Sequence, residues 1–258
     1  MAVTLDLGGR SALVTGAGQG VGAGIADLLA RAGARVAVND LVAERAEAQA
    51  AALRAEGGDA TAAAFDVTDH AAVAAAVAAL GGVDILVNNA GNAGGDSWPG
   101  MCNFVDTEPG DWDRFLDVNL RGVMHCIHAV LPSMIVGGWG RVVTIVSDSS
   151  RTGEPKMAVY AAAKAGAAGL GRSVAKEVAR HGITVNNVSL GTMRTPISEA
   201  SWVDISDEQA AARLRGYAIR RPGLPEDAAG LVGYLVSPGA SWITGQTIPL
   251  NGGYSVAQ

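Results

Sequence analysis

Short apolar runs alternate with longer segments of helix-forming residues along the whole chain. The runs consist mostly of Val, Ile, Leu and Ala and end in Gly, Asn, Asp or Ser, which is typical of buried strands followed by turns. The segments between them are rich in Ala, Leu, Glu and Arg, which favour helices. The pattern predicts strands at residues 11–16, 34–40, 61–67, 83–91, 141–147, 183–189 and 246–253. It predicts helices at residues 22–31, 42–56, 69–80, 111–136, 158–181 and 225–236.

The regular alternation of strands and helices predicts a single α/β domain over residues 1–258. Near-continuous apolar strands are buried on both faces, and right-handed crossovers place helices on each side of a parallel sheet. The predicted fold class is therefore a Rossmann-type, doubly wound parallel sheet of about seven strands with helices on both faces. Ligands of such sheets bind outside the carboxyl ends of the strands, so we expect the functional residues there.

Composition and charge restrict the classes of function. The chain has 258 residues, of which 49% are apolar, and a net charge of −6. The sequence shows no clustered basic face, and the net negative charge would repel the phosphate backbone of a nucleic acid. No nucleic-acid partner is therefore expected. The sequence shows no long apolar run and no signal-peptide pattern, so we expect a cytoplasmic protein without a membrane partner. Cys102 and Cys126 form neither a disulfide framework nor a metal motif and are expected to be reduced.

A glycine-rich turn, TGAGQGVG, follows the first predicted strand. Gly16, Gly18, Gly20 and Gly22 would let the backbone turn tightly and approach a pyrophosphate at the N-terminus of the next helix. Glycines also simply end strands, and the turn alone does not separate a dinucleotide site from that alternative.

Asp40 ends the second predicted strand, 18 residues after Gly22. A carboxylate at this place accepts hydrogen bonds from the adenosine ribose hydroxyls and repels the 2′-phosphate of NADP. None of Gln19, Asn39 and Leu41 is basic, so we expect no neighbouring cation to neutralise the carboxylate. The predicted cofactor is therefore NAD. The alternative is that Asp40 only caps the following helix.

Tyr160 and Lys164 are four residues apart in a predicted helix and therefore share one face. A neighbouring cation stabilises a phenolate and would lower the pKa of Tyr160, which would then exchange a proton with an alcohol or a carbonyl. Ser147 directly follows the predicted strand RVVTIV, where its hydroxyl would hydrogen-bond the reacting oxygen. The alternatives are a solvated lysine beside a half-buried tyrosine, and a serine that caps a turn.

Four motifs occur in order: TGAGQGVG, NNAG at residues 88–91, Ser147 thirteen residues before Tyr160, and YAAAK. Together they resemble the short-chain dehydrogenase/reductase family over essentially the whole chain. The resemblance implies a nicotinamide-dependent oxidoreductase with a catalytic tetrad of Asn119, Ser147, Tyr160 and Lys164. In this family pattern Tyr160 is the general acid and base, and Ser147 orients the substrate oxygen. Lys164 would bind the nicotinamide ribose, and Asn119 would hold a water that connects Lys164 to solvent.

The resemblance also implies a set of residues that contact NAD. Asp66 and Val67 would lie at the adenine ring, and residues 89–91 along the adenosine ribose. Thr195 would lie at the nicotinamide carboxamide. The chain departs from the family pattern at Leu190, which stands in place of the usual proline and leaves φ free there. The expected cofactor-binding residues are Gly16, Gly18, Gln19, Gly20, Val21, Gly22, Asp40, Leu41, Asp66, Val67, Asn89, Ala90, Gly91, Tyr160, Lys164, Gly191, Met193 and Thr195.

Three segments that follow predicted strands are expected to form the substrate wall. A long connection, residues 194–222, would close over the substrate as a lid. Large apolar side chains on these segments would make the pocket apolar, or else belong to the core or to an oligomer contact. The three segments are residues 91–104, 147–159 and 195–223. Their large apolar side chains are Trp98, Met157 and Trp202.

The stretches SDSSRTG and HGITVN resemble the branch of the family that acts on hydroxyacyl and oxoacyl thioesters, including alicyclic hydroxyacyl-CoA dehydrogenases. The expected substrate is therefore a small alcohol or ketone carried as a thioester on CoA or on a carrier protein. The alternatives are a steroid, sugar or cyclic alcohol as substrate, or a protein that binds NAD without turnover. The arginines that would meet a CoA phosphate are Arg151, Arg194, Arg220 and Arg221.

His125 and His128 share a predicted helix face, but no third ligand accompanies them in the sequence, so no metal is expected. Members of the resembled family assemble through the long helices that correspond to residues 111–136 and 158–181. We therefore expect a homotetramer or a homodimer.

Overall fold

Seven parallel strands form one sheet in the computed structural model, which describes residues 5–92, 102–196, 198–203 and 205–256. Their order in the sheet is β3-β2-β1-β4-β5-β6-β7, which confirms the predicted fold class. The order reverses between β1 and β4, and a reversal of this kind opens a ligand crevice at the carboxyl ends of the strands. The strands are β1 (Ser11–Val14), β2 (Arg35–Val38), β3 (Asp59–Ala62), β4 (Ile85–Asn88), β5 (Gly140–Ser147), β6 (Ile183–Leu190) and β7 (Thr247–Leu250).

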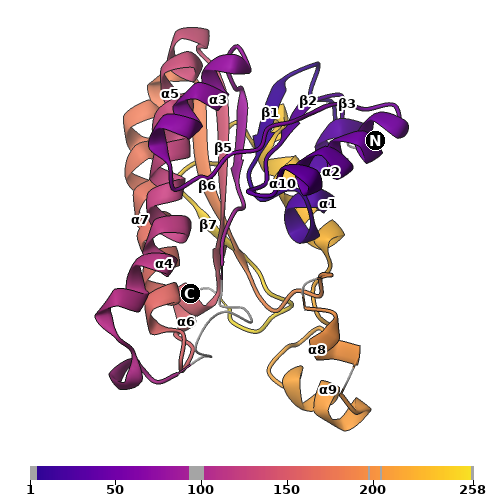
Figure 1. The fold of residues 1–258 in the computed structure, drawn as a ribbon, viewed down its shortest axis with the longest axis vertical. Coiled ribbons are helices and arrows are strands. Elements are labelled where there is room, and N and C mark those ends of the chain that lie inside the picture. Colours follow the sequence, from indigo (N-terminus) through magenta and orange to yellow (C-terminus); the bar gives the residue numbers. More distant parts are fainter. Residues whose placement is uncertain (1–4, 93–101, 197, 204, 257–258) are drawn as a thin grey trace.

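Two layers of helices cover the two faces of the sheet (Figure 1). Ile25 and Val232 belong to the buried cluster beneath one layer, and Ile127 and Val174 to the cluster beneath the other. Both faces therefore bury apolar side chains, as the near-continuous apolar runs predict. The first layer contains α1 (Gly20–Arg31), α2 (Ala43–Ala55) and α10 (Pro225–Val236). The second contains α3 (His70–Ala79), α5 (Gly122–Gly137) and α7 (Ala158–Val178).

Short helices connect these elements. Three of them, α6, α8 and α9, lie at the same end of the molecule, beyond the long helices (Figure 1). The short helices are η1 (Phe104–Asp106), η2 (Pro109–Asp111), α4 (Trp112–Leu116), α6 (Ser149–Thr152), η4 (Ala179–His181), α8 (Ala200–Val203), α9 (Asp207–Arg213) and η5 (Pro238–Ala240).

The third strand lies earlier than the predicted range of residues 61–67. It covers Asp59–Ala62, and the chain then leaves the sheet. The side-chain amide of Asn39 donates hydrogen bonds to the carbonyl oxygens of Ala63 and Phe65, at 2.9 and 3.0 Å. These carbonyls are satisfied by a side chain instead of a strand partner, so the apolar run continues as a loop.

The helix predicted at residues 111–136 is not a single α-helix. A π-turn, η3 (Asp117–Arg121), separates α4 from α5. Asn119 lies in this turn and is completely buried. Because π-turns inside helices are frequent at functional sites, this local departure directs attention to Asn119.

One helical stretch, Pro109–Gly137, is long and apolar enough by length and composition to cross a membrane. Its side chains Val123, Ile127 and Val130 are buried in the core cluster beneath the second helix layer. Packing against the sheet therefore accounts for their apolar character.

Candidate active site

Tyr160, Ser147 and Lys164 meet at the carboxyl end of β5. Ser147 is the last residue of this strand, and Tyr160 and Lys164 lie one turn apart near the start of α7. The phenol of Tyr160 is hydrogen-bonded to Ser147, and the Lys164 Nζ atom lies 5.9 Å from the centre of the tyrosine ring. Nζ donates a 2.9 Å hydrogen bond to the carbonyl oxygen of Ile145. The structure thus brings together three of the four residues of the predicted tetrad.

Burial controls the protonation of this pair. It raises the pKa of Tyr160 above its usual value of 10.0, and the hydrogen bond from Ser147 offsets only part of that rise. Burial also lowers the pKa of the Lys164 ammonium group from 10.5 to about 8. The pKa of Tyr160 is therefore raised overall and not lowered as the neighbouring Lys164 led us to expect, because desolvation of the phenolate dominates.

Ser147 is oriented by its neighbour Ser149. The Ser147 Oγ atom accepts hydrogen bonds from the Ser149 hydroxyl at 2.9 Å and from the Ser149 amide at 3.3 Å. Because these two bonds use acceptor positions, the hydrogen of the Ser147 hydroxyl is left to point at the Tyr160 phenol, and a substrate oxygen bound there would receive it instead. Ser149 is the first residue of α6, is 5% exposed, and was not among the residues predicted from the sequence.

Asn119, the fourth tetrad residue, lies close to Lys164 but does not contact it directly. A Cβ atom added to Gly91 would lie 2.8 Å from the Asn119 Oδ1 atom and 3.1 Å from the Lys164 Nζ atom. The Asn119 amide donates to the carbonyl oxygens of Phe115 and Asn92, both at 3.0 Å. These bonds fix the Asn119 carbonyl beside Gly91, on the side where the lysine ammonium group lies.

The glycine-rich turn has the shape of a cradle for a phosphate. Gly16 and Gly20 adopt positive φ values of 61° and 63°. A Cβ atom at Gly22 would approach the Asn89 amide nitrogen to 2.4 Å, and one at Gly16 would approach the Ala90 Cα atom to 2.8 Å. Asn89 in turn donates to the Thr15 and Gly16 carbonyl oxygens at 2.9 Å. Side chains at the two glycines would therefore clash with the segment expected to line the ribose.

The first turn of α1 continues this cradle. Gln19 precedes the helix and makes no side-chain bond to its amides. The first N–H groups of a helix point toward an anion placed there, so this turn fits the pyrophosphate of a dinucleotide. Thr195, from the segment after β6, also reaches this place, because its methyl carbon would be 3.7 Å from a Cβ atom at Gly20.

Asp40 presents one carboxylate oxygen to the same turn. Its Oδ1 atom accepts three hydrogen bonds, from the Val42 amide and from the Nε and Nη2 atoms of Arg45. No residue in the described part of the chain donates to Oδ2, which would lie 2.6 Å from a Cβ atom at Gly18. The alternative that Asp40 only caps the following helix accounts for its bond to the Val42 amide but not for its second oxygen. That oxygen, Oδ2, faces the expected adenosine site.

The prediction that no cation neutralises Asp40 is wrong. Arg45, in the first turns of α2, forms an ion pair with Asp40 at 2.7 Å. None of the residues directly next to the turn or the strand end, Gln19, Asn39 and Leu41, supplies this cation. Arg45 is five residues beyond Asp40, and the fold of the strand-to-helix connection brings it back.

The other residues expected at the cofactor are distributed around the same strand ends. Asp66 bonds the Thr68 amide and hydroxyl at 2.8 Å, and Val67 is buried against Gly122. Met193 forms a bridge with Gly223. Leu190 remains in register between Ser147 and Leu250, so the missing proline leaves β6 intact to its last residue. Two further expected residues are Val21, which packs against the core, and Leu41, which is 68% exposed. Gly191 would place a Cβ atom 3.0 Å from Asn251.

Asp148, which follows Ser147 directly, is the centre of a buried polar network that the sequence analysis missed. It is 3% exposed and forms an ion pair with Arg151 at 2.7 Å. Its Oδ2 atom accepts hydrogen bonds from the Asn251 amide and the Ser255 hydroxyl, both at 2.7 Å. The network thus ties the C-terminal segment to the loop that carries Ser147.

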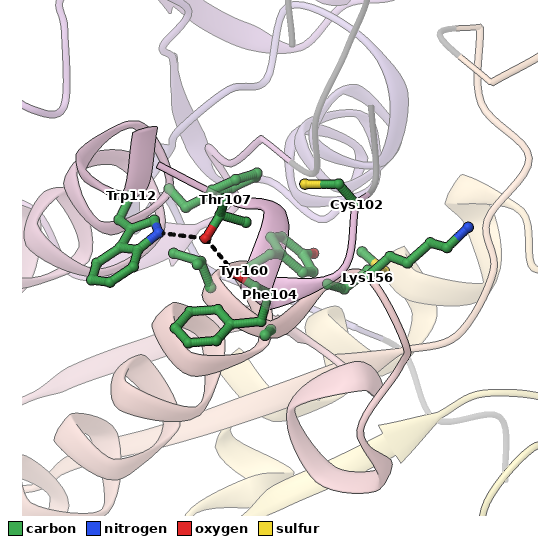
Figure 2. Close-up of a pocket in the computed structure, with 10 residues that line it drawn as sticks. Cys102, Phe104, Thr107, Trp112, Lys156 and Tyr160 are labelled. Carbon is green, nitrogen blue, oxygen red and sulfur yellow. Dashed lines mark hydrogen bonds between the residues drawn. The ribbon is translucent and has the colours of Figure 1, made fainter. Parts of the chain in front are cut away.

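A pocket beside Tyr160 is walled mainly by apolar side chains (Figure 2). Phe104 and Trp112 are stacked with ring centres 5.5 Å apart. The hydroxyl of Thr107 accepts from the Trp112 indole at 3.0 Å and donates to the Phe104 carbonyl at 2.8 Å, so its hydrogen is used within the wall. The residues that line the pocket are Cys102, Phe104, Thr107, Trp112, Phe115, Lys156, Met157, Ala158, Val159 and Tyr160.

The expected substrate-wall residues are only partly at this pocket. Met157 lines it, whereas Trp202 lies against the Arg213 guanidinium group, 5.6 Å away. Trp98 lies outside the described residues. The four arginines expected at a CoA phosphate already have partners within the chain. These are Asp148 for Arg151, Glu199 for Arg194, Asp227 for Arg221, and the Leu214 and Arg215 carbonyls for Arg220.

His125 and His128 are joined by His70, from the start of α3. The His70 Nε2 atom lies 3.4 Å from the His128 Nδ1 atom, and His125 bonds the Val67 carbonyl. Within the described ranges, no group of three His, Cys, Asp or Glu side chains is placed to hold a metal ion.

Known proteins match this chain over nearly its whole length. Residues 16–255 match a family model described as enoyl-(acyl carrier protein) reductase. The 3-oxoacyl-[acyl-carrier-protein] reductase of Staphylococcus aureus is 38% identical, over 95% of this chain and 97% of its own. A short-chain dehydrogenase/reductase of Armillaria gallica is 39% identical, over 98% of each chain.

A solved structure shows the same fold. The gluconate 5-dehydrogenase of Burkholderia cenocepacia, in complex with NADP and tartrate, is 34% identical with a TM-score of 0.89, over 99% of this chain and 98% of its own. Strand order, glycine-rich turn, the arrangement around Tyr160 and these similarities agree. The chain belongs to the short-chain dehydrogenase/reductase family.

Proposed function

We propose that the protein is an NAD(H)-dependent oxidoreductase that interconverts a secondary alcohol and a ketone, with a hydroxyacyl or oxoacyl thioester as substrate. The observation that carries this proposal is the position of Tyr160. Its phenol lines an apolar pocket, is bonded to Ser147, and lies over the buried ammonium group of Lys164. A proton donor and acceptor thus borders an apolar pocket in a chain whose glycine-rich turn fits a dinucleotide.

The residues of this chain would handle the proton. A bound NAD(H) would supply or accept the hydride. Because the pKa of Tyr160 is raised by burial, its phenol is protonated at neutral pH and can donate to a ketone oxygen. The hydroxyl of Ser147 would hydrogen-bond the same oxygen. In the oxidising direction Tyr160 must first lose its proton, so we expect oxidation to become faster as the pH rises and reduction to become slower.

Asp40 supports NAD as the preferred cofactor. Its Oδ2 atom is free to accept a hydrogen bond from a ribose hydroxyl and carries negative charge where NADP has its 2′-phosphate. The Burkholderia cenocepacia relative is described in complex with NADP, so cofactor choice varies among similar proteins and must be measured for this one.

The pocket wall supports a substrate with an apolar carbon body. Phe104 and Trp112 form a stacked apolar surface, and the Thr107 hydroxyl uses its only hydrogen within the wall. A polyol such as gluconate would leave several hydroxyl groups without partners against this part of the wall, which is unfavourable. An acyl chain or an alicyclic ring would be buried favourably. The similarity to 3-oxoacyl-[acyl-carrier-protein] reductases points the same way.

The test is a panel of substrates with each cofactor. Purified protein would be assayed with acetoacetyl-CoA, a cyclohexanone, a sterol ketone and gluconate, using NAD(H) and NADP(H) at matched concentrations. We expect the thioester with NADH to give the highest kcat/KM. We expect Tyr160→Phe to lower kcat by about a hundredfold or more without changing NADH affinity.

Three results would contradict parts of the proposal. Absence of turnover with any thioester would refute the substrate class. Faster turnover with NADPH would refute the cofactor preference. Full activity of Tyr160→Phe would refute the mechanism.

A further inference from the structure

The ion pair at the end of β2 involves only one oxygen of Asp40. Both guanidinium bonds from Arg45, from Nε at 3.0 Å and Nη2 at 2.7 Å, end on Oδ1. The Asp40 side chain is 6% exposed, whereas that of Arg45 is 43% exposed. The carboxylate is therefore buried and fixed, whereas a little under half of the arginine side chain is exposed to solvent.

Arg45 also borders the glycine-rich turn. A Cβ atom at Gly18 would lie 2.8 Å from the Arg45 Cβ atom and 2.6 Å from the Asp40 Oδ2 atom. The stem of the arginine and the free oxygen of the carboxylate thus both lie beside Gly18 of the turn. A phosphate on the 2′-hydroxyl of the adenosine ribose would meet both groups, one repulsive and one attractive.

We propose that Arg45 is a cofactor-specificity residue that makes the site tolerant of NADP(H), and that Asp40 restrains it. This rests on the proposed function, since it concerns how the same dinucleotide site distinguishes a 2′-hydroxyl from a 2′-phosphate on the adenosine ribose. Arginine binds phosphate through charge-assisted hydrogen bonds, and the guanidinium group of Arg45 has N–H donors beyond the two that bind Asp40. Its charge also offsets the repulsion between the carboxylate and the phosphate. Discrimination against NADP is therefore moderate in this chain, and it depends on two residues with opposite effects.

The test measures binding and does not depend on turnover. Dissociation constants of NAD⁺ and NADP⁺ would be obtained by isothermal titration, together with the shift in melting temperature that each ligand causes. The variants are Arg45→Gln, Asp40→Asn and the double variant. Arg54→Gln is the matched control, because Arg54 lies on the same helix, is 44% exposed and is paired with Glu47.

We expect Arg45→Gln to weaken NADP⁺ binding about tenfold relative to NAD⁺, and Arg54→Gln to leave the ratio of the two constants unchanged. Asp40→Asn should strengthen NADP⁺ binding by about tenfold or more, and the double variant should lose that gain. Equal ratios for Arg45→Gln and Arg54→Gln would overturn the proposal. So would a double variant that keeps the affinity of Asp40→Asn for NADP⁺. Failure of the wild type to bind either dinucleotide would instead refute the proposed function, and this inference with it.

Discussion

Replacing Lys164 by methionine should stabilise the fold while removing activity. Methionine has a similar length and no charge. Burial lowers the pKa of Lys164 from 10.5 to about 8, and one pKa unit corresponds to ~1.4 kcal/mol, so keeping the ammonium group buried costs the folded state about 3 kcal/mol at neutral pH. Losing the hydrogen bond to the Ile145 carbonyl offsets about 1 kcal/mol of this. The free energy of unfolding should therefore rise by about 2 kcal/mol.

The effect must depend on pH in a defined direction. Because the pKa of Lys164 is lower in the folded state than in the unfolded chain, the cost is fully present below about pH 8. It disappears between about pH 8 and pH 10.5, as the unfolded chain also loses its proton. The difference in unfolding free energy between Lys164→Met and the wild type should therefore shrink over this interval.

Urea unfolding followed by circular dichroism at pH 7 and at pH 10, without cofactor, measures this difference. Lys176→Met, an exposed position on the same helix, is the control and should change neither stability nor kcat. We expect kcat of Lys164→Met to fall by about a hundredfold or more, because the proton path beside Tyr160 is removed. A variant less stable than the wild type at pH 7, or a difference that persists at pH 10, would refute the reasoning.

Two further substitutions test the surroundings of the site. Gly91→Ala places a Cβ atom 2.8 Å from the Asn119 Oδ1 atom, so we expect kcat to fall at least about tenfold. Gly230→Ala, where a Cβ atom meets nothing within 4 Å, should leave kcat unchanged, and equal kcat values for both variants would contradict this. Asp148→Asn replaces one carboxylate oxygen by an amide NH₂ group, a donor that would face other donors such as the Ser255 hydroxyl. We therefore expect the free energy of unfolding to fall by about 2 kcal/mol. Limited proteolysis should then cleave the C-terminal segment faster, and an unchanged cleavage rate would count against the proposed role of the network.

The short-range pattern of the sequence was enough for much of the fold. All seven strands were predicted, because apolar runs and the turns that follow them are local features. The helical spacing of Tyr160 and Lys164 also placed them correctly on one face. The third strand was misplaced because the Asn39 side chain, 24 and 26 residues earlier, takes up the Ala63 and Phe65 carbonyls. That contact leaves no periodic signal in the sequence.

The features that tune the site come from contacts between distant or folded-back segments. The sequence alone determined a doubly wound sheet, a glycine-rich turn with an acidic strand end, and a tyrosine and lysine on one helical face. Only the tertiary structure showed that burial raises the pKa of Tyr160, that Arg45 neutralises Asp40, and that Asp148 binds Ser255, 107 residues away. The physical reason is that residue type and spacing set local conformation, whereas desolvation and charge pairing depend on which segments the completed fold brings together.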